Sequence, residues 1–179
     1  MKKNVLVFGL ISGVVISAMM VYAASICCAN PEMKGNDVLG YAGMVAAFSF
    51  IFVGIRNHRE KYNGGFITFG GAFKIGFYIS LIASTIYVLA GWWTVKSLFP
   101  EFLDSYIQHV LYVERLDGAT AAELQQKTAE MADFKENYKN PLFFLLVTYA
   151  EVLPLALIIT LISALLLKRK PKAGNVVAG

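Results

Sequence analysis

The 179-residue chain is 57% hydrophobic and 16% charged, with a net charge of +4 and a mean hydropathy of +0.58. A soluble domain of this length carries about 45–50% apolar and about 25% charged residues, so the composition excludes an ordinary soluble protein and indicates a membrane protein. It also argues against nucleic acid as a partner, because the basic residues lie at the ends of apolar segments rather than together on one soluble module.

The first apolar segment, 5–29, contains no charged residue. A hydrocarbon core of ~30 Å takes about 20 helical residues to cross, so this segment predicts a transmembrane helix. Two lysines before it also resemble the start of a signal peptide, with a weak cleavage site at 21–23. The run is longer than the apolar stretch of a signal peptide, and we favour an uncleaved helix. Cys27 and Cys28 are interpreted as apolar residues near its end.

Three further segments predict membrane-spanning helices. The run 38–55 is short but uncharged, the run 75–95 is uncharged, and the run 142–167 is interrupted only by Glu151. The expected helices cover about 38–55, 72–97 and 141–168. Helices are expected because backbone polar groups in lipid must bond within their own segment.

The charges that flank these segments predict the orientation. The N-terminal end, the 56–65 loop and the tail from Lys168 onward hold nine basic residues and one acid, whereas the two intervening loops hold six basic residues and ten acids. Positively charged loops stay in the cytoplasm. We therefore expect both termini and the 56–65 loop in the cytoplasm and the 99–140 segment outside.

Several residues are expected to anchor the helices at the membrane interfaces. Trp92 and Trp93 suit the outer interface, where an indole ring is apolar and its N–H stays wet. Lys74 lies about 27 Å below Trp92 along a helix, at the inner interface, where its ammonium reaches the headgroups. Lys168 and Arg169 mark the inner end of the fourth helix.

Small residues at four-residue spacing predict close helix packing, since they let helix backbones approach in lipid. For any single stripe the alternative stays open that small residues are simply common in membrane helices. The predicted packing residues are Gly9, Gly13, Gly43, Ala47, Gly76, Ser80, Ser84, Ala156 and Thr160.

A candidate polar site interrupts the last apolar segment at Thr148, Glu151 and Pro154. Glu151 lies about 25 Å above Lys168 along a helix, near the outer boundary, which excludes an ion pair with Lys74. Pro154 predicts a kink because it removes a backbone donor. We favour a structural role, in which Glu151 accepts hydrogen bonds from neighbouring helices or from the outer segment. The alternative is a proton or cation site at the mouth of a cavity.

The segment 99–140 predicts a helical hairpin outside the membrane. An amphipathic helix is expected from Pro100 to about Leu116. Thr120 and Glu123 then form the capping-box pattern that opens a second helix. The apolar faces of the two hairpin helices would pack against each other, lie on the bilayer or contact a partner protein.

The chain resembles the bacterial membrane-protein family called domain of unknown function 4199. The stretches that carry the resemblance are NPLFFLLVTYAEVLPLALIITLISALLLKRK, FVGIRNHRE and NGGFITFGGAFKIGF. It covers nearly the whole chain and implies a four-span protein of the bacterial cytoplasmic (inner) membrane. It implies no activity.

The expected fold is an all-α integral membrane protein, a four-transmembrane-helix bundle with an extracytoplasmic helical hairpin between helices 3 and 4. Residues 1–98 would hold the first three helices, 99–140 the hairpin, 141–168 the fourth helix and 169–179 a cytoplasmic basic tail.

The sequence contains no catalytic motif, phosphate-binding loop or metal-ligand spacing. We therefore expect neither an enzyme nor a cofactor. The favoured hypothesis is a scaffold or partner-binding protein that uses the outer hairpin. Its partners would be the lipid bilayer and a membrane or periplasmic protein, or a second copy of the chain. The alternative is a small transporter or ion-coupled membrane protein that uses Glu151 near the proline kink.

Overall fold

The computed structural model describes residues 1–32 and 37–170. These residues form α-helices and one short π-helical turn, and contain no strand beyond an isolated bridge. The elements are α1 (Lys2–Ala29), α2 (Asp37–Tyr62), α3 (Phe69–Trp93), the π-helical η1 (Thr94–Leu98), α4 (Phe102–Leu116), α5 (Ala121–Tyr138) and α6 (Pro141–Leu167). The prediction of an all-helical chain with four long apolar helices is confirmed.

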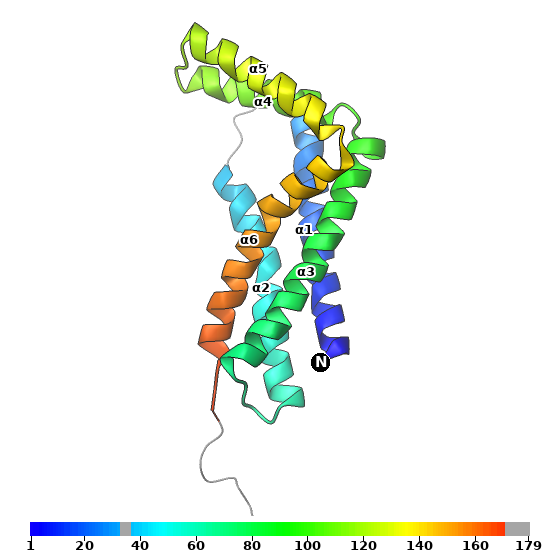
Figure 1. Ribbon diagram of the computed structural model, residues 1–179, viewed down its shortest axis with the longest axis vertical. Helices are drawn as coiled ribbons and strands as arrows, with labels where there is room; N and C mark the ends of the chain where they lie inside the picture. Colours follow the sequence, from blue (N-terminus) through cyan, green and yellow to red (C-terminus); the bar gives the residue numbers. More distant parts are fainter. Residues whose placement is uncertain (33–36, 171–179) are drawn as a thin grey trace, which may run out of the picture.

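The four long helices α1, α2, α3 and α6 run side by side (Figure 1). Helix α3 packs against α1, α2 and α6. Fully buried side chains fill this region, among them Phe48, Ile51, Ile55, Ile75 and Ile79. In lipid such packing stabilises through dispersion contacts rather than through removal of apolar surface from water.

Glycines allow the close approach of α1 and α6 to α3. A Cβ atom at Gly9 would lie 2.8 Å from Ile82 Cγ2, and one at Gly13 would lie 2.7 Å from Ile86 Cδ1. On the other side of α3, a Cβ at Gly76 would lie 2.7 Å from Thr160 Cγ2. These separations are far below van der Waals contact, so the helices would have to move apart to admit a side chain.

The other small residues named from the sequence also lie between helices. Gly43 of α2 faces Met19 of α1, and the carbonyl of Ala47 accepts a 2.9 Å hydrogen bond from Ser12 Oγ. Between α3 and α6, the hydroxyl groups of Ser80 and Thr160 lie 2.8 Å apart, close to the carbonyl of the buried Ala156. Ser84 is buried, and its Oγ has no hydrogen-bond partner among the described residues.

Helix α2 extends beyond the predicted 38–55 segment, so Arg56 and Arg59 lie on the helix and not in a loop. No helix breaker occurs before Gly64 and Gly65, which have positive φ values of 61° and 87°. The longer helix brings Arg59 Nη1 to 3.0 Å from the carbonyl of Leu167, at the C-terminal end of α6. A cation is favourable there because it meets the negative end of the helix dipole.

Helices α4 and α5 lie side by side across the end of the molecule that is opposite the N-terminus, and their connecting turn reaches past the long helices (Figure 1). The predicted start of α4 at Pro100 is wrong. Pro100 lies in a turn, and the helix begins at Phe102. The predicted capping box is confirmed, since Thr120 Oγ1 accepts from the backbone N–H of Glu123 while the Glu123 carboxylate accepts from that of Thr120.

Candidate functional site

Glu151 of α6 meets α3 through a phenol. Tyr87 Oη donates a 3.2 Å hydrogen bond to Glu151 Oε1. Tyr87 is buried, whereas Glu151 is exposed on the flank of α6 and makes no ion pair among the described residues. The carboxylate therefore accepts a hydrogen bond from a neighbouring helix, while its other side is exposed.

Two further side chains complete this polar cluster, which consists of Tyr87, Tyr138, Thr148 and Glu151. Thr148 is buried and donates its hydroxyl to the carbonyl of Phe144 at 2.8 Å. Tyr138, at the end of α5, interacts with Thr148 and lies close enough to Glu151 for their charges to interact. Burial, with a further contribution from the Glu151 charge, raises the pKa of the Tyr138 phenol. The cluster thus joins α3, α5 and α6.

Pro154 lies inside α6, one turn beyond Glu151. It has no N–H to donate to the carbonyl of Ala150, so this turn of the helix lacks one backbone hydrogen bond. In Figure 1 the first turns of α6 lie at an angle to the later ones. The bend brings the N-terminal turns of α6 toward α5.

A cleft lies above the polar cluster, where the end of α3 meets α4, α5 and the start of α6. Its volume is about 260 Å³, and Trp92, Lys96 and Phe144 lie on its walls. The rings of Trp92 and Phe144 pack edge to face at 5.1 Å, and Lys96 Nζ lies 5.1 Å from the centre of the Trp92 ring. Tyr138 connects the two features, because it lines the cleft and belongs to the polar cluster.

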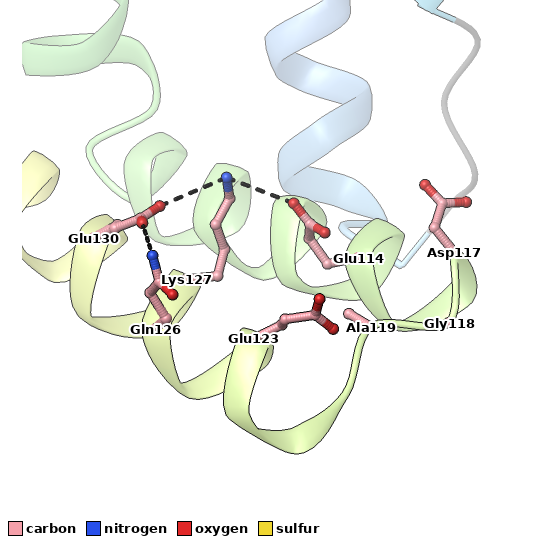
Figure 2. Close-up of a pocket in the computed structure, with 8 residues that line it drawn as sticks. All are labelled: Glu114, Asp117, Gly118, Ala119, Glu123, Gln126, Lys127 and Glu130. Atoms are coloured by element: carbon pink, nitrogen blue, oxygen red, sulfur yellow. Dashed lines mark hydrogen bonds and ion pairs between the residues drawn. The ribbon is translucent and has the colours of Figure 1, made fainter.

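The turn between α4 and α5 carries a second, shallower hollow of about 430 Å³ (Figure 2). Lys127 Nζ lies between two carboxylates, 3.5 Å from Glu114 and 3.8 Å from Glu130. Glu123 is held by the capping box, and these hydrogen bonds lower its pKa. Among the described residues no group of three or more His, Cys, Asp or Glu side chains is placed to hold a metal ion.

The residues named as interface anchors lie at the two ends of the long helices. Lys74 is exposed near the start of α3, and Trp92 and Trp93 lie at its other end, where Trp93 is 58% exposed. Lys168 and Arg169 are exposed directly after α6, and backbone hydrogen bonds tie Arg169 to Ile67. Lys74 and Glu151 are not brought together.

A family model described as "Protein of unknown function (DUF4199)" matches residues 7–169. The chain belongs to this family. The resemblance inferred from the sequence is therefore confirmed. No curated protein and no solved structure matches the chain.

Sequence reasoning named Glu151 and Thr148 but missed their partners. A usable signal was present for Tyr87, because it follows Ser80 and Ser84 at the spacing that keeps residues on one helix face. Tyr138 had no such signal, since its contact depends on how α5 joins α6. The cluster offers a carboxylate beside phenols, which suits hydrogen bonding and proton exchange.

Proposed function

We propose that this DUF4199 protein is a non-enzymatic scaffold of the bacterial inner membrane that binds a partner protein through α4 and α5. The observation that carries the proposal is the exposure of α5. None of its described residues is buried, and α4 buries only Leu103 and Ser105. A well-capped pair of helices with so little of its own surface covered is suited to contact another molecule.

Local interactions keep α5 helical without a core. The capping box closes its first turn, Gln126 donates to Glu130 at 3.0 Å, and Lys139 pairs with Glu136 at 2.7 Å. Such pairs support a polar helix by a few tenths of a kcal/mol each. Helix α5 can therefore present a formed surface rather than fold upon binding.

Charge indicates what the partner surface carries. Carboxylates surround the turn between α4 and α5, with one lysine among them (Figure 2). A basic patch on a membrane or periplasmic protein would complement this turn. Placement of α4 and α5 outside the membrane follows from the positive-inside rule. The N-terminus, the α2–α3 turn and the C-terminal end of α6 share the opposite end of the molecule (Figure 1), and the basic residues of these segments support a cytoplasmic position for that end.

Site-specific photocrosslinking in native membranes tests this proposal. A photoreactive residue at the exposed Gln125 of α5 is expected to give a crosslinked partner, whereas one at Leu166, which is 69% exposed near the other end of α6, is expected to contact lipid. Asp117→Lys with Glu130→Lys, at two carboxylates of the turn between α4 and α5, should abolish the Gln125 product. An unchanged product would overturn the proposed surface, and a product of twice the chain mass would identify a second copy as the partner.

A second candidate function is ion-coupled transport through Glu151. The hydrogen bond from Tyr87 and the open side of the carboxylate favour it, because a carboxylate that has no ion-pair partner among the described residues and lies in a membrane-spanning helix can take up and release a proton. Solute and proton flux into liposomes should then fall when Glu151→Gln replaces the parent protein. Equal flux in the two proteins would remove Glu151 from any transport step.

A further inference from the structure

The cleft at the base of α4 and α5 combines cations with an apolar floor. We call it the basal cleft. It is defined by Trp92, Lys96, Leu103, Lys135, Lys139 and Phe144. Phe144 is 2% exposed and Leu103 is 9% exposed, so the floor is fixed by packing, while the ammonium groups of Lys96 and Lys139 belong to exposed side chains at the rim. A ligand that suits it must be anionic on one side and apolar on the other.

The positive charge of the basal cleft is only partly neutralised. Lys135 pairs with Asp104, and Lys139 lies 2.7 Å from Glu136, with the two side chains of that pair 63% and 71% exposed. Exposed pairs of this kind are weak and readily exchanged. Lys96 makes no ion pair among the described residues and rests over the Trp92 ring. The lining of the cleft therefore carries three lysines against one carboxylate, Asp104, which leaves it with a net positive charge.

The surroundings of the cleft are those of a membrane interface. Trp92 and Trp93 lie at the end of a membrane-spanning helix, where tryptophan marks the headgroup level. On the same part of the molecule α3 exposes Leu89, and α6 exposes Leu142 and Leu146, each at more than 60%. A ligand entering from the bilayer would thus meet apolar helix surface below the lysines.

We propose that the basal cleft binds the phosphate headgroup of an anionic phospholipid, with the acyl chains lying along the exposed leucines of α3 and α6. The volume fits this occupant. About 260 Å³ is below the about 300–1,000 Å³ of pockets that enclose a whole drug-sized ligand, so the cleft holds a headgroup while the chains stay in the bilayer. Each lysine near an anionic lipid surface strengthens binding to that surface about fivefold. This inference goes beyond partner binding and does not depend on it.

The test uses the full-length protein in neutral detergent, titrated with short-chain phosphatidylglycerol, short-chain phosphatidylcholine or inorganic phosphate. Trp93→Phe leaves Trp92 as the single tryptophan, since the chain has two, and its emission reports on the cleft. Retained lipids are counted in parallel by native mass spectrometry. This second readout is needed because Lys96 contacts the reporter ring. The variant is Lys96→Gln with Lys139→Gln, its rescue is Lys96→Arg with Lys139→Arg, and the control is Lys127→Gln near the acidic turn.

The proposal is supported if phosphatidylglycerol binds saturably and if this binding is about 25-fold weaker in the double glutamine variant. The arginine variant should restore the binding, and Lys127→Gln should leave it unchanged. Equal binding of the neutral and anionic lipids overturns it, as does an unaffected double glutamine variant. If inorganic phosphate saturates the site as tightly as the lipid does, the ligand is a soluble anion and the lipid assignment is wrong.

Discussion

The contact between α1 and α3 at Gly13 gives a sharp prediction about stability. In the middle of a helix, Gly→Ala normally stabilises by up to about 1 kcal/mol. At Gly13 the added Cβ would lie 2.7 Å from Ile86 Cδ1, 2.9 Å from Ile86 Cβ and 3.2 Å from Ala83 Cα. A terminal methyl can rotate away, but Ile86 Cβ and the Ala83 backbone cannot. Gly13→Ala must therefore push the two helices apart.

The expected net effect of Gly13→Ala is a loss of about 1–2 kcal/mol, because overpacking costs about 1–3 kcal/mol and the helix preference of alanine recovers part of it. The matched control is Gly40→Ala in α2, where an added Cβ meets no atom of the described residues within 4 Å. Thermal unfolding in detergent compares both variants with the parent protein. A rise in Tm for Gly13→Ala as large as that for Gly40→Ala would refute the close approach of α1 and α3.

Three further predictions concern individual hydrogen bonds. Tyr87→Phe should cost about 0.5–1.5 kcal/mol of stability, whereas Glu151→Gln, which retains an acceptor oxygen, should cost less. Thermal unfolding measures both losses, and a larger loss for the glutamine variant would count against the hydrogen bond from Tyr87 to Glu151. Because hydrogen bonds hold the pKa of Glu123 below its usual range, its contribution to α5 is present above the unfolded pKa of about 4.3 and is lost as the pH falls further. After correction for the intrinsic pH dependence of amide exchange, the protection of amides in the first turn of α5 should therefore fall at acidic pH in the parent protein. Thr120→Ala should weaken this dependence, and identical protection profiles for the two proteins would contradict the capping box. Arg59→Gln removes the donor to the last carbonyl of α6 and should speed exchange in the last turn of α6, with no change in α5 as the internal control.

The four long helices follow from the sequence because a bilayer crossing requires an uninterrupted apolar run, and that requirement is local. The N-terminal ends of α5 and α6 are also local, since Thr120 and Asn140 cap them with their own side chains. The start of α4 was misplaced because Pro100 suits a turn as well as a first helical position. Nothing in the local sequence separates these two uses.

The features that could not be predicted from the sequence depend on contacts between segments that are far apart in the chain. Glu151 and Tyr87 are 64 residues apart, and their hydrogen bond depends on the register of α3 against α6. The cations of the basal cleft come from two separate parts of the chain, with Lys96 on η1 and with Lys135 and Lys139 at the C-terminal end of α5. Their convergence depends on the path of the chain between the third and fourth spans, which amphipathic periodicity does not define.

The central claim is that α4 and α5 stand outside the membrane while the basic end faces the cytoplasm. Single cysteines at Gln125 of α5 and Lys61 of α2, in a chain lacking Cys27 and Cys28, can be labelled with a membrane-impermeant reagent. We expect position 125 to react in intact spheroplasts and position 61 to react only after lysis. Labelling of position 61 with protection of position 125 in intact spheroplasts would contradict this orientation and the partner surface proposed for α4 and α5.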